Sequence, residues 1–209
     1  MEFTRRGVLG AMGLAGLAAV GMKSAAGAQE APKRITIGKP YELRTMDPHS
    51  STDQTAWEIQ AVVYESLFFL DYVDGEFVPV PGLAESFDRP DDRTYVFTIR
   101  PEVTFHNGRE LSAEDVVFSL NRVLDPVIGA WWRTRLGPPV AATSAIPPEF
   151  PEVGVTFEVT GPLQVTATLT EPYSPFLQAL AATVTAIVPG AEVASGEIDL
   201  DTQMVGTGP

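Results

Sequence analysis

The side chains that most often carry out catalysis or hold metals are few in this sequence. It has no cysteine and two histidines, His49 and His106, and neither histidine has a partner at the spacing of metal ligands. Asp71, Asp74 and Glu76 match a calcium loop only loosely, and a solvated hairpin explains them. No nucleophile elbow, zinc-protease motif or phosphate-binding loop is present in the body of the chain. These observations predict no enzymatic activity, no cofactor and no metal site.

The N-terminus has the layout of an export signal. Arg5 and Arg6 precede an uncharged run at residues 7–22, and Ala26-Gly27-Ala28 offers the small residues of a cleavage site. The run is too short and too rich in Gly and Ala to match the roughly 20 apolar residues that span a bilayer. Paired arginines before such a run resemble the twin-arginine class of signals. We therefore expect residues 1–28 to be a cleaved signal peptide of that type.

Charge and composition exclude several classes of binding partner. The chain carries a net charge of −13, and the expected signal contributes positive charge, so the mature part is more acidic still. Such a chain cannot bind nucleic acid by neutralising phosphates, and anionic lipid repels it. The absence of cysteine also excludes a lipid anchor at the cleavage site. We expect a soluble, monomeric protein in the periplasm.

Hydrophobic patterns predict the elements of the first half of the mature chain. Residues 35–37 are expected to form a short strand, and residues 54–67 a helix whose apolar residues at helical spacing are Trp57, Ala61, Val62 and Tyr64. Residues 68–70 are expected to be a buried strand end, before a hairpin turn at Asp74-Gly75. Residues 94–100 alternate and are rich in β-branched and aromatic residues, which predicts a strand.

A capped helix and a strand pair are predicted in the second half. Ser112 can accept a hydrogen bond from the backbone N–H of Asp115, and the buried stripe of the helix that follows is Val116, Val117, Leu120, Val123 and Leu124. Residues 137–151 are rich in Pro and Ala and are expected to form a surface connection. Two strands follow at 153–159 and 163–169, before a short helix from Pro175. This mixture indicates an α/β or α+β fold.

Several segments, in the same order along the chain, resemble landmarks of family 5 of the bacterial extracellular solute-binding proteins. The longest covers the predicted strand, an Asn107-Gly108 turn and the capped helix. The others are Leu43–His49, Tyr64–Leu67, Glu171–Leu177 and Val205–Pro209. The resemblance extends over nearly all of the mature part. The family includes binding proteins for oligopeptides, dipeptides and nickel.

The resemblance implies an α/β fold of the class II periplasmic-binding-protein type, with two lobes around a cleft and an extra subdomain in the first lobe. Residues 29–64 would begin the first lobe, 65–170 would form the extra subdomain, and 171–209 would return to the first lobe. In the family, the segment that resembles Val205–Pro209 is followed by Tyr and a long further chain. We therefore expect the sequence to be an N-terminal fragment without the second lobe.

The resemblance also implies a function. Such a protein is the periplasmic substrate-binding component of an ABC importer, which captures a peptide or related small solute and delivers it to a membrane permease and its ATPase. The alternative is a peptide sensor or chaperone-like binder with no transport role. Permease and ATPase genes next to this one would favour transport, and their absence would favour the alternative. Because the second lobe would be missing, we expect residues 29–209 alone to bind no solute detectably by calorimetry.

Two regions match ligand-lining segments of the family. One is the loop before the first helix, with the polar residues Ser51, Thr52, Asp53 and Gln54. These polar residues could contact a ligand at the helix N-terminus, or Thr52 or Asp53 could simply cap the helix, and the two explanations have equal weight. The other is the pair Trp131-Trp132. Because adjacent side chains point in different directions, we expect one indole to pack inside and one to face the cleft; the alternative is that the pair serves only to pack the subdomain.

Other residues that stand out are interpreted as structural or as evidence against one branch of the family. A surface turn explains His106, and a helix-end acid explains Asp115. The nickel-binding branch uses an arginine and a methionine-containing loop. Here the residues after Leu180 read Ala-Ala-Thr-Val-Thr, and the helix after His49 carries Ala56 and no methionine. The nickel branch is therefore disfavoured.

Overall fold

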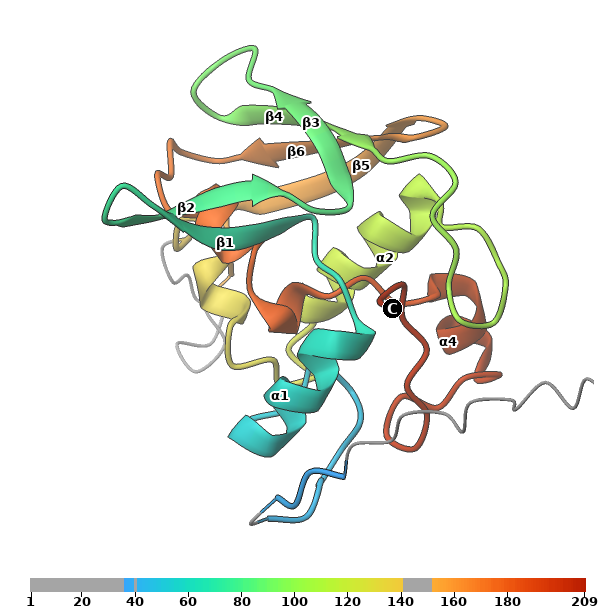
Figure 1. The fold of residues 1–209 in the computed structure, drawn as a ribbon. Coiled ribbons are helices and arrows are strands. Elements are labelled where there is room, and N and C mark those ends of the chain that lie inside the picture. The colour runs from blue at the N-terminus through green and yellow to red at the C-terminus, as the bar shows by residue number, and fades with distance from the viewer. Residues whose placement is uncertain (1–35, 40, 141–151) are drawn as a thin grey trace, which may run out of the picture. The chain divides into compact units, whose positions relative to one another are not determined.

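The computed structural model describes residues 36–39, 41–140 and 152–209 (Figure 1). The expected signal peptide and residues 141–151 of the expected connection lie outside the described residues. Within Lys39–Pro209, the described residues pack as one compact unit. Residues 36 and 37 have no regular secondary structure, so the strand predicted at 35–37 is wrong for the two of its residues that are described.

A four-stranded antiparallel sheet, in the order β3-β4-β6-β5, forms one layer of the molecule. Its strands are β3 (Ala84–Asp88), β4 (Thr94–Ile99), β5 (Val155–Gly161) and β6 (Gln164–Leu169). In β4 the side chains of Tyr95, Phe97 and Ile99 are buried and alternate with half-buried ones, as period-2 geometry requires. The strands predicted at 94–100, 153–159 and 163–169 are confirmed.

Helix α2 (Ala113–Leu124) packs against this sheet, and Figure 1 shows it directly beneath the strands. Ser112 is its N-cap, and the Asp115 carboxylate completes the capping box by accepting from the Ser112 backbone N–H. The predicted stripe is confirmed, with full burial of Val116, Leu120 and Val123. The opposite side of α2 contacts the short helix α4 (Gly190–Ser195), so both faces of α2 are covered.

Helix α1 (Gln54–Val63) is shorter than predicted and buries a different face. It ends at Tyr64 because that residue has extended backbone angles, φ −112° and ψ 150°. The buried side chains are Thr55, Ala56 and Gln60, whereas Val62 is 60% exposed. The predicted apolar stripe is therefore wrong for Ala61 and Val62, whereas Tyr64 is buried and Trp57 is half-buried. A polar face can be buried here because the Gln60 amide is satisfied on both sides, by the Ser51 hydroxyl and the Met46 carbonyl.

Strands β1 (Phe68–Val73) and β2 (Glu76–Pro81) form a separate hairpin. Asp74 and Gly75 both have positive φ, 51° and 94°, which is the geometry of the predicted two-residue turn. Of the strand end expected to be buried, only Phe68 is; Phe69 and Leu70 are exposed. The prediction was wrong for these two residues, because every side chain of β1 beyond Phe68 is exposed.

Short elements complete the unit. They are the 3-10 turns η1 (Arg133–Arg135) and η2 (Thr183–Thr185) and the one-turn helix α3 (Phe176–Ala179). The main core lies between the sheet, α2 and α3, with large aromatic side chains at Phe97, Phe105 and Phe176. Among the described residues, no helix has the length and apolar character needed to cross a membrane.

Candidate ligand-binding site

All three tryptophans of the chain come together on one side of the unit, although two of them lie more than seventy positions after the first. The ring centroids of Trp57, in α1, and Trp131 are 5.5 Å apart. Those of Trp131 and Trp132 are 4.8 Å apart in an edge-to-face arrangement. Such contacts between aromatic rings are favourable beyond the area that they bury.

These indoles line a pocket of about 220 Å³. Its other lining residues come from the segment that contains η2: Ala182, Thr183 and Val184. We call this pocket, with its six lining residues, the tryptophan slot. It unites residues from α1, from the connection after α2 and from the segment after α3, so the slot exists only in the folded chain.

Hydrogen bonds hold two of the three indoles in place. The Trp57 indole Nε1–H donates to the Ser51 carbonyl oxygen at 3.2 Å, and the Trp132 Nε1–H donates to the Ala179 carbonyl oxygen at 3.2 Å. Trp131 is 43% exposed, and its indole N–H has no partner within the described residues. Trp132 is thus anchored and half-buried, while Trp131 offers an open ring surface.

The polar loop before α1 has mainly structural contacts. Ser51 is fully buried and its hydroxyl donates to Gln60 Oε1 at 2.8 Å. Asp53 is the N-cap of α1 and accepts from the Ala56 backbone N–H at 2.9 Å, so the capping explanation is confirmed for Asp53. Thr52 and Gln54 are exposed.

None of the four loop residues lines the tryptophan slot. Ser51 nevertheless acts on it indirectly, because its carbonyl oxygen positions Trp57. Direct contact of Ser51, Thr52, Asp53 or Gln54 with a ligand stays a prediction, as does contact of Trp131 or Trp132.

Sequence reasoning missed four lining residues of the slot. Trp57 was assigned to the buried stripe of α1, and residues 182–184 were considered only for the arginine that they lack. The sequence offered one signal: Trp57 is the only tryptophan besides Trp131 and Trp132, and it lies three residues after Gln54 in the candidate loop. The small residues at 182–184 carry no comparable signal.

A buried charged network supports the segment behind η2. Arg122, in α2, donates to both carboxylate oxygens of Asp47, at 3.0 and 2.7 Å, and to His49 Nδ1 at 2.8 Å. With Nδ1 accepting, His49 Nε2 donates to the Ala186 carbonyl oxygen at 2.9 Å. The network joins three distant parts of the chain and fixes the backbone just after the slot.

The same geometry sets the charge states of this network. Burial lowers the pKa of His49 to about 4, and the neighbouring Arg122 acts in the same direction. Burial alone would raise the pKa of Asp47, but the hydrogen bond and charge of Arg122, together with His49 and its backbone N–H, outweigh burial and hold that pKa below its usual value. His49 is therefore neutral and Asp47 charged at neutral pH. No group of three potential metal ligands occurs within the described parts of the chain.

A second network explains Asp115. Its carboxylate accepts two hydrogen bonds from Arg109, at 2.8 and 2.7 Å, and one from the Gly190 backbone N–H at 2.8 Å. Burial opposes ionisation, but these bonds lower the pKa of Asp115 overall. The Arg109 side chain also reaches Glu192 in α4. The structural interpretation of Asp115 is confirmed.

His106 makes tertiary contacts beyond those of a simple surface turn. Its backbone N–H donates to the Gly206 carbonyl oxygen at 2.9 Å, and its Nε2 lies 2.8 Å from the Gly208 carbonyl oxygen. These contacts hold the last residues of the chain against the turn after β4. His106 is structural, as predicted, although for a different physical reason.

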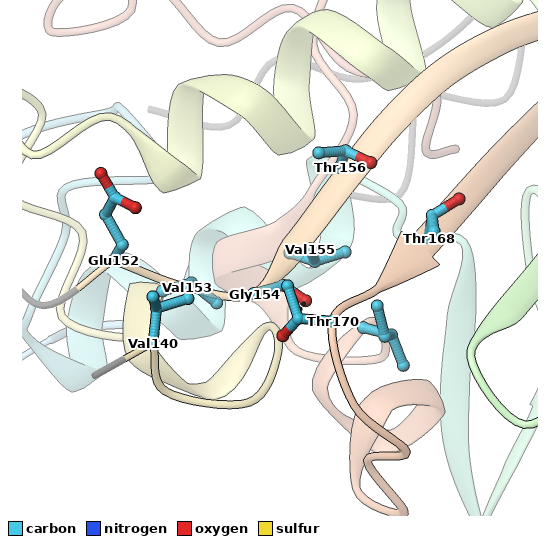
Figure 2. A pocket seen from close by; sticks show the side chains of 9 residues that line it. Val140, Glu152, Val153, Gly154, Val155, Thr156, Thr168 and Thr170 are labelled. Atoms are coloured by element: carbon cyan, nitrogen blue, oxygen red, sulfur yellow. Dashed lines mark hydrogen bonds between the residues drawn. The ribbon is translucent and has the colours of Figure 1, made fainter.

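A larger pocket, of about 440 Å³, lies at the ends of β5 and β6 (Figure 2). Figure 2 shows Thr156 and Thr168 on the strands, with Glu152 at the other end of the pocket. None of the candidate residues lines it. Val140 and Glu152 flank residues 141–151, which lie outside the described residues, and we assign this pocket no role.

Comparison with known proteins agrees with the resemblance seen in the sequence. The model of the family described as bacterial extracellular solute-binding proteins, family 5 Middle, matches residues 78–209. The glutathione-binding protein GsiB of Escherichia coli K12 is 29% identical over 197 residues, which are 93% of this chain and 35% of that protein. The periplasmic oligopeptide-binding protein OppA of the same strain is 32% identical over 121 residues, 57% of this chain and 22% of that protein.

Solved structures agree with the fold. OppA of Burkholderia pseudomallei superposes with a TM-score of 0.63 and 27% identity, covering 82% of this chain and 34% of that one. The binding protein AgaA of A. tumefaciens R10, in complex with agropinic acid, superposes with a TM-score of 0.65 and 27% identity. The match covers 80% of this chain and 30% of that one. The chain thus spans about a third of the length of the relatives that it matches.

The family comprises binding proteins and not enzymes, in agreement with the prediction made from the motifs. The mixed helix and sheet architecture is that of part of a periplasmic binding protein. The chain belongs to family 5 of the bacterial extracellular solute-binding proteins.

Proposed function

We propose that this protein is the solute-capturing component of an ABC importer for peptides or related small solutes. Family membership, shown by the match over residues 78–209, carries the proposal. The names of the relatives support a peptide-like solute, since they are a glutathione-binding and an oligopeptide-binding protein. The partners would be a membrane permease and its ATPase, with the protein itself exported to the periplasm as a monomer.

The tryptophan slot supports a place for the solute within this part of the protein. It is concave, mostly apolar and built on residues from three segments, as ligand pockets usually are. In the proposed arrangement, residues 29–64 and 171–209 belong to the first lobe and residues 65–170 to the extra subdomain. Trp131 and Trp132 contact the solute, and the Ser51–Gln54 loop lies at the edge of its site.

Uptake by living cells tests the transport role. Deleting the intact gene from its own host should abolish accumulation of the labelled peptides that the purified gene product binds, and re-expression should restore it. A host that retains full uptake after deletion would contradict the importer proposal. Peptide binding without any uptake defect would instead favour the sensor or chaperone-like role.

A further inference from the structure

The lining of the tryptophan slot indicates which part of a solute it accepts. Its surface is made of three indoles, an alanine, a valine and a threonine, with no charged side chain. Apolar groups gain free energy on entering such a surface, whereas a charged group loses its hydration without finding a partner. At about 220 Å³ the slot is smaller than the roughly 300–1,000 Å³ that is typical of pockets for whole ligands. It has the size for one side chain and not for a complete peptide.

Indole faces by themselves also attract cations, so the charge around the slot decides between an apolar and a cationic group. The guanidinium carbon of Arg135 lies 4.6 Å from the centroid of the Trp132 ring. Within the described part of the chain, no carboxylate lies within 4.0 Å of Arg135. A positive charge therefore already occupies one indole of the slot, and a second cation entering beside it would be repelled.

Trp131 provides the surface that a ligand would meet first. It is 43% exposed, and its ring contacts both Trp57 and Trp132. The three rings thus form a continuous aromatic wall with Trp131 in the middle. An incoming aromatic ring could pack against this wall in the tilted or edge-to-face geometries that such rings prefer.

We propose that the tryptophan slot binds one uncharged apolar side chain of the solute, with a preference for an aromatic one, and that Arg135 excludes a cationic side chain. Trp57, Trp131 and Trp132 supply the binding surface, and Arg135 sets the charge selectivity. The inference rests on the proposed function, because it takes the solute to be a peptide or a related molecule with side chains.

Calorimetry on the product of the intact gene tests the proposal with four tripeptides: Phe-Ala-Ala, Ala-Phe-Ala, Lys-Ala-Ala and Ala-Lys-Ala. For at least one position, phenylalanine should bind more tightly than lysine by about tenfold or more, the usual gain from burying such a side chain. Trp131→Ala should lower the affinity for the phenylalanine peptide by about fivefold or more, and should lower the affinity for the lysine peptide by a clearly smaller factor. Tyr72→Ala, which removes an exposed ring from β1, is the matched control and should change neither affinity.

A second variant isolates the charge. Arg135→Gln should raise the affinity for the lysine peptide by about threefold or more, because it removes a nearby like charge. The affinity for the phenylalanine peptide should change little. Arg100→Gln, at an exposed arginine that does not line the slot, should leave both affinities as they are.

The outcomes separate the two proposals. Equal affinity for phenylalanine and lysine peptides, or an unchanged phenylalanine affinity in Trp131→Ala, overturns the slot's selectivity and leaves the importer role standing. A lysine affinity that Arg135→Gln does not raise overturns the role of Arg135. Failure of every peptide to bind overturns the inference together with the proposed peptide-binding function.

Discussion

At the scale of single residues, buried charges link segments that are distant in sequence. Arg122 has a side chain only 16% exposed and pairs with Asp47, whose side chain is 6% exposed. Such a pair is weak evidence of added stability, but breaking it leaves one charge buried without a partner. His49 completes the network as a neutral acceptor and donor. Removing any one member therefore has a larger effect than the same change at the surface.

Arg122→Ala should lower the free energy of unfolding by about 3–5 kcal/mol, because it leaves the Asp47 carboxylate buried and unpaired. Urea denaturation monitored by circular dichroism measures the change. Arg89→Gln is the matched control, since it removes an arginine from an exposed pair with Asp92, where about 0.5 kcal/mol or less is expected. Similar losses in the two variants would show that Asp47 finds another partner when Arg122 is absent.

The lowered pKa of His49 predicts loss of stability in mild acid. In the unfolded chain the histidine takes up a proton below about pH 6.5, while in the folded chain it does so only near its pKa of about 4. The unfolded state therefore binds more protons between these values, and the free energy of unfolding should fall by roughly 3 kcal/mol across that window as pH decreases. Denaturation at pH 7 and at pH 4.5 measures it.

Two histidine variants make the acid prediction specific. His49→Gln should remove most of the pH dependence between pH 6.5 and 4, whatever it does to overall stability. His106→Gln, at the exposed histidine, should retain that dependence. A pH profile that is the same in His49→Gln and the unchanged protein would assign acid sensitivity to other groups.

At the scale of elements, close backbone approach ties the end of the chain to α1. The Gly208 backbone N–H donates to the Val63 carbonyl oxygen at 3.0 Å. A Cβ atom at Gly206 would lie 2.1 Å from that same oxygen, and one at Gly208 would lie 2.8 Å from it. The glycines of the Val205–Pro209 landmark are thus required by packing against the C-terminal end of α1.

Gly206→Ala should destabilise the fold by about 1–3 kcal/mol, the usual cost of forcing extra atoms into a packed region. Thermal unfolding of the variant measures it. Gly38→Ala is the control, because no atom would lie within 4 Å of a Cβ at this position, and the change there should be small. An equal stability of the Gly206 variant and the unchanged protein would mean that the segment can move away from α1 without cost.

At the scale of the whole molecule, export to the periplasm is part of the function that we propose. The described unit is acidic overall, with a cluster of apolar and aromatic residues in the tryptophan slot and buried charge networks elsewhere. The chain spans about a third of the length of its relatives. The twin-arginine signal expected at residues 1–28 would direct the protein to the periplasm.

Replacing both Arg5 and Arg6 by lysine should abolish most export, because twin-arginine signals are read through the paired arginines. Fractionation of host cells followed by immunoblotting measures the periplasmic share. Lys23→Arg keeps the charge of the signal and leaves the pair intact, so export should continue. Undiminished export of the double variant would place the protein on the general secretory route instead.

Local patterns predicted about half of the fold. The β4 strand, the β5–β6 pair, the Asp74-Gly75 turn and α2 with its Ser112 cap are each specified by residues close together in sequence. The buried face of α1 was not predictable in this way. It depends on Ser51 and Met46 satisfying Gln60, and spacing alone favoured the apolar face that Val62 exposes.

The candidate site likewise has a part that the sequence predicts and a part that it does not. The sequence by itself determined the family, the absence of catalytic motifs and the choice of Trp131 and Trp132 as candidate residues, because these follow from residue identity and order. Only the tertiary structure decided that Trp57 joins them, that Ser51 positions Trp57, and that Arg135 covers one indole. The physical reason is that a pocket is made of contacts between distant segments, and their packing has no periodicity that the sequence displays.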